Sequence, residues 1–250
     1  VIATRDRPVL LRRAVDAVLS QAYDGPIQVT AVFDQSEPDA SLERDGVRVC
    51  RNERTPGLPG ARNTGVGATS HPLVAFCDDD DVWLPGKLAT QVERFDDAAV
   101  EVATTGIVVV AGERRTPRVV PSGWVAHSDL ARSRVLAAHP STFLFRREAF
   151  EAIGPVDESI PGGFAEDYEW LLRAARLVAL GELLQELLAA LGDILERVLH
   201  ALGLGGRPAW NGIGGRLLRH AFPLLHHWLC GVSCDIFSIP VPYLVAFVPG

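Results

Sequence analysis

The 250-residue sequence contains no methionine and lacks several features that would assign it to a specialised class. Its four cysteines are scattered, which excludes a disulfide framework and favours a reducing compartment. The formal net charge of -7 argues against a basic stripe, so we expect no nucleic-acid partner. The sequence has no uninterrupted apolar run of about 18 residues for a membrane span. It also has no Walker loop and no dinucleotide fingerprint, which disfavours a kinase or a dehydrogenase.

The composition is that of a globular protein, with 48% hydrophobic and 22% charged residues. This length is enough for one large domain or two small ones. The sequence begins inside an apolar, strand-like run with no signal peptide before it, and we interpret the chain as one whose natural start has been trimmed or as a fragment. We expect a cytoplasmic protein or one that lies at the periphery of a membrane.

Strand and helix patterns alternate along the first hundred residues. Apolar runs predict strands at 1–4, 27–33, 47–50 and 73–77. Helical spacing or small-residue content predicts helices at 8–21, 60–69 and 88–95. Further strands are predicted at 100–111 and 141–145 and a helix at 147–153, whereas 114–133 shows no clear pattern. Because parallel strands need helical crossovers, the alternation predicts an α/β fold with a parallel sheet.

The strand predicted at 73–77 runs directly into four aspartates, Asp78 to Asp81. Four carboxylates in a partly buried site repel one another unless a cation lies among them. Mg²⁺ and Mn²⁺ prefer oxygen ligands, usually one or two carboxylates with substrate phosphates. A solvated acidic turn that caps the next helix, near Pro85, is the structural alternative. The carboxyl end of a parallel strand favours the metal site, because ligands of open α/β sheets bind there.

A second acidic pair, Glu166 and Asp167, follows Gly162-Gly163 and opens a predicted helix. Acids in a first turn are stabilised by the helix dipole, which is a purely structural explanation. A carboxylate at a loop–helix junction is also well placed to act as a general base. The residues alone leave both explanations open.

Five segments in this order resemble the family 2 glycosyltransferases, inverting enzymes of the GT-A fold that transfer sugars from nucleotide donors. The matching segments are 1–8, 31–36, 57–65, 78–85 and the acidic residues of 157–167. Ala3, Arg5 and Phe33 depart from the residues that are frequent in the family. The resemblance implies a GT-A nucleotide-sugar-binding fold with a mostly parallel central sheet, followed by a helical C-terminal segment.

The resemblance also implies how a nucleotide-sugar donor would be held. Thr4 belongs to the opening strand and turn that hold the donor base, and Asp34 would meet the base itself. Arg62 would help to position the donor, and Asp79 would lie near the ribose.

The same resemblance implies the chemistry. Asp80, helped by Asp78, would hold a divalent cation, Mn²⁺ or Mg²⁺, and Asp167 would deprotonate the acceptor hydroxyl. The acceptor would be a carbohydrate, a lipid-linked molecule or another hydroxyl compound. Two other functions stay open: a sugar-phosphate nucleotidyltransferase and a non-catalytic nucleotide-sugar-binding protein.

The resemblance ends near residue 177, so we expect a glycosyltransferase domain at 1–177 and a helical and irregular segment at 178–250. Leucines recur at helical spacing from Leu180 to Leu202, with acidic residues on the other face. Core packing is the first interpretation of this helix, and self-association is the second. Membrane-surface association is the third, because the polar face of membrane-surface helices is normally basic and that of this helix is acidic. The set His226, His227, Cys230 and Cys234 fits a zinc site poorly, since zinc sites prefer tighter cysteine pairs.

Overall fold

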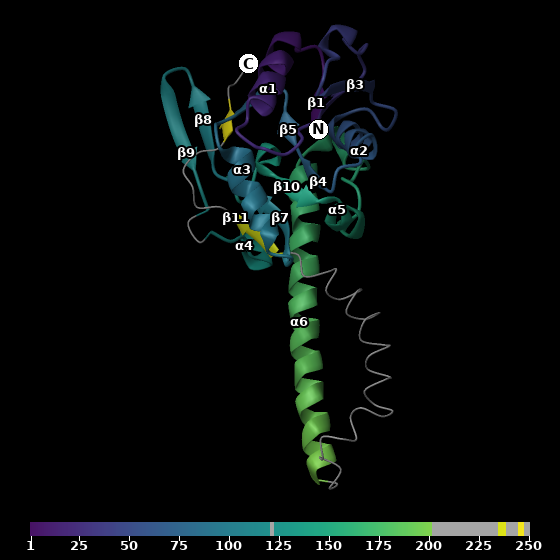
Figure 1. Ribbon diagram of the computed structural model, residues 1–250, viewed down its shortest axis with the longest axis vertical. Helices are drawn as coiled ribbons and strands as arrows, with labels where there is room; N and C mark the ends of the chain where they lie inside the picture. Colours follow the sequence, from purple (N-terminus) through teal and green to yellow (C-terminus); the bar gives the residue numbers. More distant parts are fainter. Residues whose placement is uncertain (121–122, 202–234, 239–244, 248–250) are drawn as a thin grey trace.

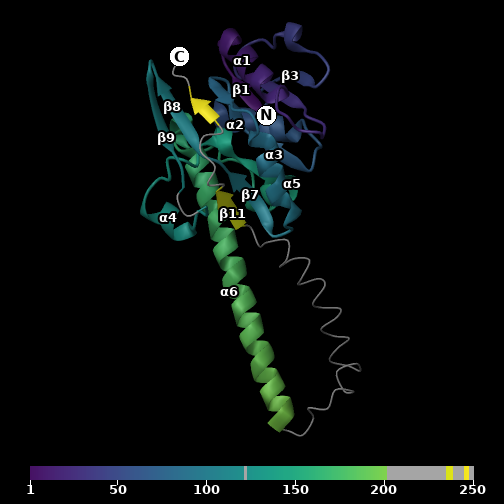
Figure 2. The ribbon, with the colours of Figure 1, turned by 60° about the vertical axis from the view of Figure 1, so that its left-hand side comes forward.

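The structure is a computed structural model that describes residues 1–120, 123–201, 235–238 and 245–247. Its described strands form three four-stranded sheets, in the orders β3-β2-β1-β5, β11-β7-β10-β4 and β6-β12-β8-β9. Figures 1 and 2 show a mixed α/β body from which one long helix, α6, projects. This architecture confirms the predicted α/β fold class.

The first sheet is parallel throughout. β1 (Ile2–Thr4) lies between β2 (Val29–Phe33) and β5 (Cys77–Asp78), and β3 (Val47–Arg51) pairs with the outer edge of β2. The intervening helices are α1 (Pro8–Leu19), η1 (Ala40–Leu42) and α2 (Leu58–Gly67). All five residues of β2 are buried, as expected for a parallel strand covered on both faces. The carboxyl ends of β1, β2 and β5 therefore lie along one edge.

The strand predicted at 73–77 is two strands in different sheets, so that prediction was wrong. β4 (Leu73–Ala75) pairs antiparallel with β10 (Leu144–Arg146), whereas β5 joins β1. The chain changes sheets at Phe76, whose buried ring packs edge-on against Phe145 with 5.1 Å between centroids. An apolar run shows that a segment is buried but does not show which strand it pairs with.

The single strand predicted at 100–111 is likewise two strands, β7 (Val100–Thr104) and β8 (Ile107–Ala111). The segment 114–133 contains β9 (Arg114–Arg118) and α4 (His127–Arg132), and the start of the strand predicted at 141–145 is η3 (Pro140–Thr142). Two strands from the end of the chain complete the sheets: β11 (Asp235–Ser238) beside β7 and β12 (Val245–Phe247) between β6 (Asp81–Trp83) and β8.

The last helices pack around an aromatic cluster. α5 (Arg147–Ile153), η4 (Pro161–Gly163) and α6 (Glu166–Ala201) follow β10. Trp170 of α6 is buried against Phe143, Phe145 and Phe150, with centroids between 5.3 and 6.1 Å apart. These contacts fix the first turns of α6, and therefore the acidic pair that opens the helix. α6 continues without interruption through residue 177, the expected domain boundary.

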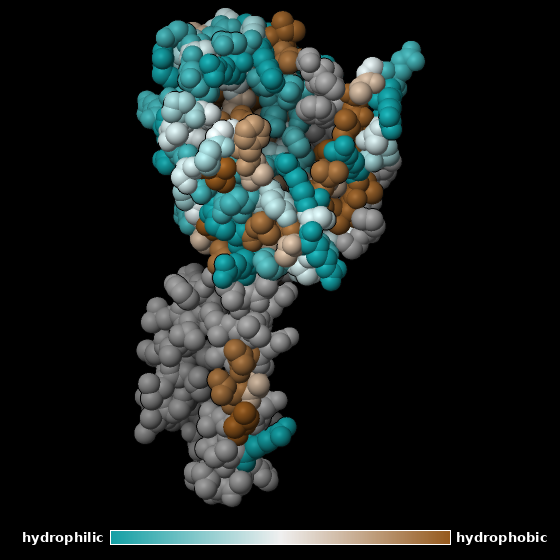
Figure 3. Space-filling model, turned by 180° about the vertical axis from the view of Figure 1, so that it is seen from behind, coloured by the Kyte–Doolittle hydropathy of each residue, from teal (hydrophilic) through white to brown (hydrophobic). Residues whose placement is uncertain are grey.

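Three apolar side chains on the projecting half of α6, Leu187, Leu191 and Ile194, are each more than half exposed. Figure 3 shows apolar surface on this helix. The interpretation of these three as core residues is therefore wrong, whereas self-association and membrane-surface association stay predictions. Among the described residues, no helix combines the length and the apolar character that crossing a membrane requires. The set from His226 to Cys234 lies outside the described residues.

Lys87, the one lysine of the sequence, is buried at the start of α3 (Lys87–Val92), which η2 (Glu93–Asp96) follows. Its Nζ donates a hydrogen bond to Gln91 Oε1 at 2.5 Å and lies 3.8 Å from the centroid of the Trp83 ring. Gln91 Nε2 in turn donates to the carbonyls of Ala103 and Thr142. Burial lowers the pKa of Lys87 to about 7.

We expect the Lys87→Met variant to lose a pH dependence that the natural chain has. Since the folded pKa lies below the ordinary 10.5, the unfolded chain binds more protons between these values, and the free energy of unfolding rises with pH there. The slope is at most about 1.4 kcal/mol per pH unit. Urea unfolding from pH 6 to 9 should show that the free energy of unfolding rises with pH in the natural chain but not in the variant. Any excess stability of the variant at low pH should therefore shrink as the pH rises. Parallel curves for the two proteins would contradict the lowered pKa.

Candidate active site

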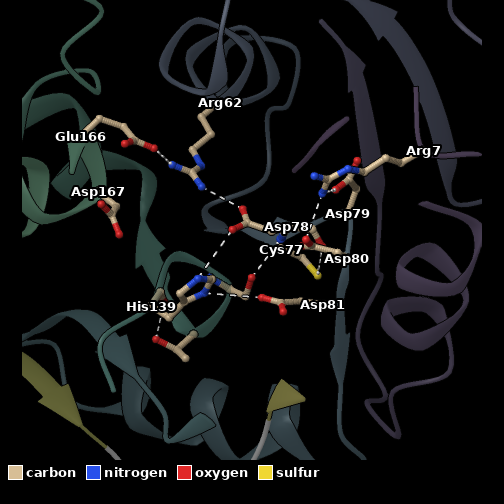
Figure 4. Close-up of polar contacts among 12 residues, drawn as sticks. Arg7, Arg62, Cys77, Asp78, Asp79, Asp80, Asp81, His139, Glu166 and Asp167 are labelled. Carbon is tan, nitrogen blue, oxygen red and sulfur yellow. Dashed lines mark hydrogen bonds and ion pairs between the residues drawn. The ribbon is translucent and has the colours of Figure 1, made fainter. Parts of the chain in front are cut away.

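The four aspartates form a tight turn at the carboxyl end of β5. Asp78 ends β5, Asp81 begins β6, which belongs to another sheet, and Asp79 and Asp80 lie between them. The side chains separate into two groups, which Figure 4 shows on different sides of the turn. The turn therefore divides the acidic run into two sites with different partners.

Asp79 and Asp80 face the connection between β1 and α1. Thr4 Oγ1 donates a hydrogen bond to Asp79 Oδ2 at 2.7 Å. Arg7 Nη1 lies 3.2 Å from Asp79 Oδ1 and 2.9 Å from Asp80 Oδ2. Burial, together with Asp78 and Asp79, raises the pKa of Asp80, and Arg7 opposes that rise. The structure thus brings together Thr4 and Asp79, two of the residues predicted to bind the donor.

Asp78 and Asp81 instead face His139. One ligand atom from each of the three residues lies within 4.8 Å of the others. His139 Nε2 is 3.8 Å from Asp78 Oδ2, and His139 Nδ1 is 3.5 Å from Asp81 Oδ2. Sequence reasoning did not select His139; the only signal was a His-Pro pair just before a predicted strand. Asp80, predicted as a metal ligand, lies outside this group.

Asp81 is the residue in this group whose charge is least compensated. Its side chain is fully buried, and among the described residues neither carboxylate oxygen has a partner within hydrogen-bond geometry. Burial and the neighbouring Asp78 raise the pKa of Asp81 to about 8, and the nearby Ser141 side chain opposes that rise. A buried carboxylate without hydrogen bonds is costly, and a bound cation removes that cost. Asp78, Asp81 and His139 thus offer two carboxylates and an imidazole that could hold a metal ion.

Arg62 of α2 connects this group to the second acidic pair. Its guanidinium is buried, with Nη2 2.8 Å from Asp78 Oδ1 and Nη1 2.5 Å from Glu166 Oε1. Burial alone would raise the pKa of Asp78, but Arg62 and then His139 hold it below its ordinary value. These two ion pairs of Arg62 fix the start of α6 relative to the aspartate turn.

Asp167 points away from this bridge. Its buried carboxylate pairs with Arg134 Nη2 at 2.7 Å, and Arg134 itself is half exposed. Adjacent helical residues point about 100° apart, which explains why Glu166 and Asp167 have different partners. Of the two acids, Glu166 is committed to a buried ion pair, whereas Asp167 has an exposed partner that an incoming molecule can displace.

Asp34 follows β2 and organises the loop that enters α2. Its Oδ1 accepts hydrogen bonds from Asn52 Nδ2 at 2.8 Å and from the Gly57 amide at 3.0 Å, and its Oδ2 accepts one from Gln35. Burial would raise the pKa of Asp34, but these hydrogen bonds lower it. Asp34 is thus an ionised carboxylate at the same sheet edge as Thr4 and Asp78.

Comparison with known proteins decides the family. A model described as glycosyl transferase family 2 matches residues 1–154, more than half of the sequence. The chain belongs to glycosyl transferase family 2. The four aspartates, Arg62 and His139 all lie within the matched residues, whereas Glu166 and Asp167 lie beyond them.

Curated relatives of this family 2 chain are distant in sequence. The succinoglycan biosynthesis protein ExoO of Rhizobium meliloti (strain 1021) is 29% identical over 154 residues, covering 59% of this chain and 43% of that protein. YwdF of Bacillus subtilis (strain 168), an uncharacterized glycosyltransferase, is 27% identical over 182 residues, covering 70% of this chain and 67% of that protein. The chain spans about half the length of the curated relatives it matches.

Solved structures support the GT-A fold of the family 2 chain. Residues 1–349 of S. aureus TarS, in complex with UDP, superpose with a TM-score of 0.57 at 20% identity, covering 71% of this chain and 54% of that one. The mannosyltransferase PcManGT from Pyrobaculum calidifontis, in complex with GDP-Man and Mn²⁺, gives 0.50 at 18% identity, covering 68% and 49%. At these identities the likeness concerns the fold alone.

Proposed function

We propose that this chain carries the donor site and the catalytic residues of a metal-dependent, inverting glycosyltransferase. The observation that carries the proposal is the buried Asp81 carboxylate, which faces Asp78 and His139 and has no hydrogen-bond partner in the part of the chain that the structure describes. It lies at the carboxyl edge of the parallel sheet, where nucleotides bind in open α/β folds. Arg62 joins this group to the acidic pair at the start of α6.

Asp78, Asp81 and His139 would hold the divalent cation. When bound, Mn²⁺ or Mg²⁺ neutralises charge that develops on a leaving nucleoside diphosphate. The complex of PcManGT with Mn²⁺ supports this choice of ion. Asp80, predicted from the sequence as a ligand, would instead pair with Arg7 on the side of the turn where the donor would bind.

Thr4, Asp34, Arg62 and Asp79 would form the donor site. Thr4, Asp34 and Asp79 are brought to one sheet edge by β1, β2 and the turn after β5. Asp34 would accept a hydrogen bond from the donor base, and Asp79, held by Thr4, would face the ribose. Arg62 would act indirectly, by fixing Asp78 and Glu166, because its guanidinium is already engaged on both sides.

Asp167 would be the general base. Arg134 orients its carboxylate, and the acceptor hydroxyl would replace Arg134 there. The deprotonated hydroxyl would attack the anomeric carbon of the donor from the face opposite the leaving diphosphate. A single displacement of this kind inverts the configuration at that carbon.

The function is tested by measuring which nucleotide sugars the chain binds and consumes. We expect one or more UDP- or GDP-sugars to raise the melting temperature in the presence of Mn²⁺, since TarS binds UDP and PcManGT binds GDP-Man. The bound donor should then be consumed with release of nucleoside diphosphate. Net synthesis of a nucleotide sugar from a sugar phosphate would instead identify a nucleotidyltransferase, and binding without turnover a non-catalytic protein.

We also propose that donor binding belongs to residues 1–177 and that 178–250 act in acceptor access or association. The groups named above all lie before residue 178, although α6 crosses that position. The same thermal-shift titration on a 1–177 protein should reproduce the affinity of the full chain for the donor. A soluble, folded 1–177 protein that binds no donor would contradict this division.

A further inference from the structure

Phe164 has an exposed fraction of 83%, the highest among the large apolar side chains of the described residues. It stands three positions before Asp167, in the loop that opens α6. A single exposed apolar side chain on a regular helix, such as Val9 at 77%, needs no functional explanation. Phe164 differs from Val9 because its loop is strained and borders a cavity.

The backbone around Phe164 holds the ring outward. Gly162, Gly163 and Ala165 have φ values of 70°, 64° and 64°, and the left-handed region is unfavourable for an alanine. The Phe164 ring lies over Gly162, because a Cβ built there would be 2.9 Å from Phe164 Cε2. The strain at Ala165 persists because Arg62 and the aromatic cluster fix the helix that follows. Strain of this kind is characteristic of functional loops.

A cavity of about 360 Å³ lies beside this loop. Its walls are the segments 55–60 and 158–163, so Gly162 both lines the cavity and supports the Phe164 ring. The volume is in the range of small-molecule sites. Leu58, 44% exposed, lines the opposite wall. Most other wall residues are glycine, proline, serine or threonine, so the polar side chains at the walls are those of Thr55, Ser159 and Glu158.

Glu158 holds the two walls together. Its carboxylate accepts hydrogen bonds from the Arg54 side chain, the Thr55 amide and Asn63 Nδ2. Burial would raise the pKa of Glu158, but these hydrogen bonds lower it to about 2. The carboxylate therefore remains ionised and bonded at neutral pH, and the cavity keeps its shape without a ligand.

We propose that Phe164 and this cavity form the subsite for a carbohydrate acceptor. A pyranose ring presents C–H groups on its faces, which pack against the electron-rich face of a phenyl ring, and hydroxyls at its rim, which backbone amides and carbonyls can bind. A lipid chain would instead require a long apolar groove. The inference rests on the proposed function, because the hydroxyl of the stacked sugar would be the one that Asp167 deprotonates.

The subsite is tested with Phe164→Ala, Phe164→Tyr and the control Val9→Ala. The probes are methyl α- and β-glycosides of glucose, galactose, mannose and N-acetylglucosamine, each with the donor that the chain consumes. We expect Phe164→Ala to raise the acceptor KM roughly three- to tenfold, with Phe164→Tyr close to the natural chain. The donor KM and the melting temperature should not change, since the ring is exposed, and Val9→Ala should change nothing.

A binding measurement separates this inference from the proposed function. Saturation-transfer NMR should show the C–H protons of at least one glycoside receiving magnetisation from the natural chain and not from Phe164→Ala, whether or not transfer occurs. If the donor is consumed but the acceptor KM of Phe164→Ala stays within twofold, the subsite is wrong while the function stands. If no glycoside binds, or if Phe164→Leu matches Phe164→Tyr, the carbohydrate assignment is overturned. If no donor is bound or consumed, the proposed function itself fails.

Discussion

The Asp167→Asn variant should lose a factor of about 10² to 10⁴ in kcat while it binds the nucleotide-sugar donor as the natural chain does. Asparagine keeps the shape of the side chain and can still accept a hydrogen bond from Arg134, but it cannot take a proton. The lost interaction belongs to the transition state, so the donor affinity should be unchanged. Calorimetry of donor binding and a turnover assay on the same preparation measure both quantities.

The neighbouring Glu166→Gln variant is the matched control. Glu166 pairs with buried Arg62, so its neutralisation should lower the free energy of unfolding. Its kcat, measured well below its melting temperature, should fall much less than that of Asp167→Asn. Near-normal turnover by Asp167→Asn would exclude the base assigned here. A larger kcat loss in Glu166→Gln than in Asp167→Asn would indicate that Glu166 is the general base.

The Asp81→Asn variant should bind Mn²⁺ at least about a hundredfold more weakly and should lose nearly all transfer activity. Removing a residue that only hydrogen-bonds to a metal ligand typically weakens metal binding about 10- to 100-fold. Removing a ligand itself should weaken Mn²⁺ binding at least as much. The substitution removes a buried carboxylate that has no hydrogen bond to the described residues, so the variant should fold with similar stability. Electron paramagnetic resonance of free Mn²⁺, with and without the donor, measures binding independently of turnover.

Asp80→Asn is the control that separates the two ligand sets. Asp80 pairs with half-exposed Arg7 and lies outside the group of Asp78, Asp81 and His139. We expect Asp80→Asn to keep most of the Mn²⁺ affinity and His139→Gln to lose part of it. If Asp80→Asn abolishes Mn²⁺ binding while Asp81→Asn does not, the ligands predicted from the sequence are right and those proposed from the structure are wrong.

The helix α1 and the strand β2 show what sequence pattern can predict. Helical spacing of apolar residues after Pro8 predicted α1 to within two residues, because its buried face is set by local periodicity. The strand pattern at 27–33, after a helix, predicted a parallel strand, and β2 is that strand with all five residues buried. In contrast, the split at Phe76 depends on Phe145, about 70 residues away, and no local pattern carries that information.

The sequence by itself determined the α/β class, the acidic run at the carboxyl end of a parallel strand and the acidic pair that opens α6. Each follows from residues close together in the chain. The sequence did not show that the strand before the acidic run, β5, lies at the edge of its sheet. Only the tertiary structure decided that Asp81 rather than Asp80 faces Asp78, that His139 joins them and that Arg62 bridges to Glu166. The physical reason is that a carboxylate's charge is compensated through space. Its partners come from whichever elements the sheet edge brings within a few ångströms.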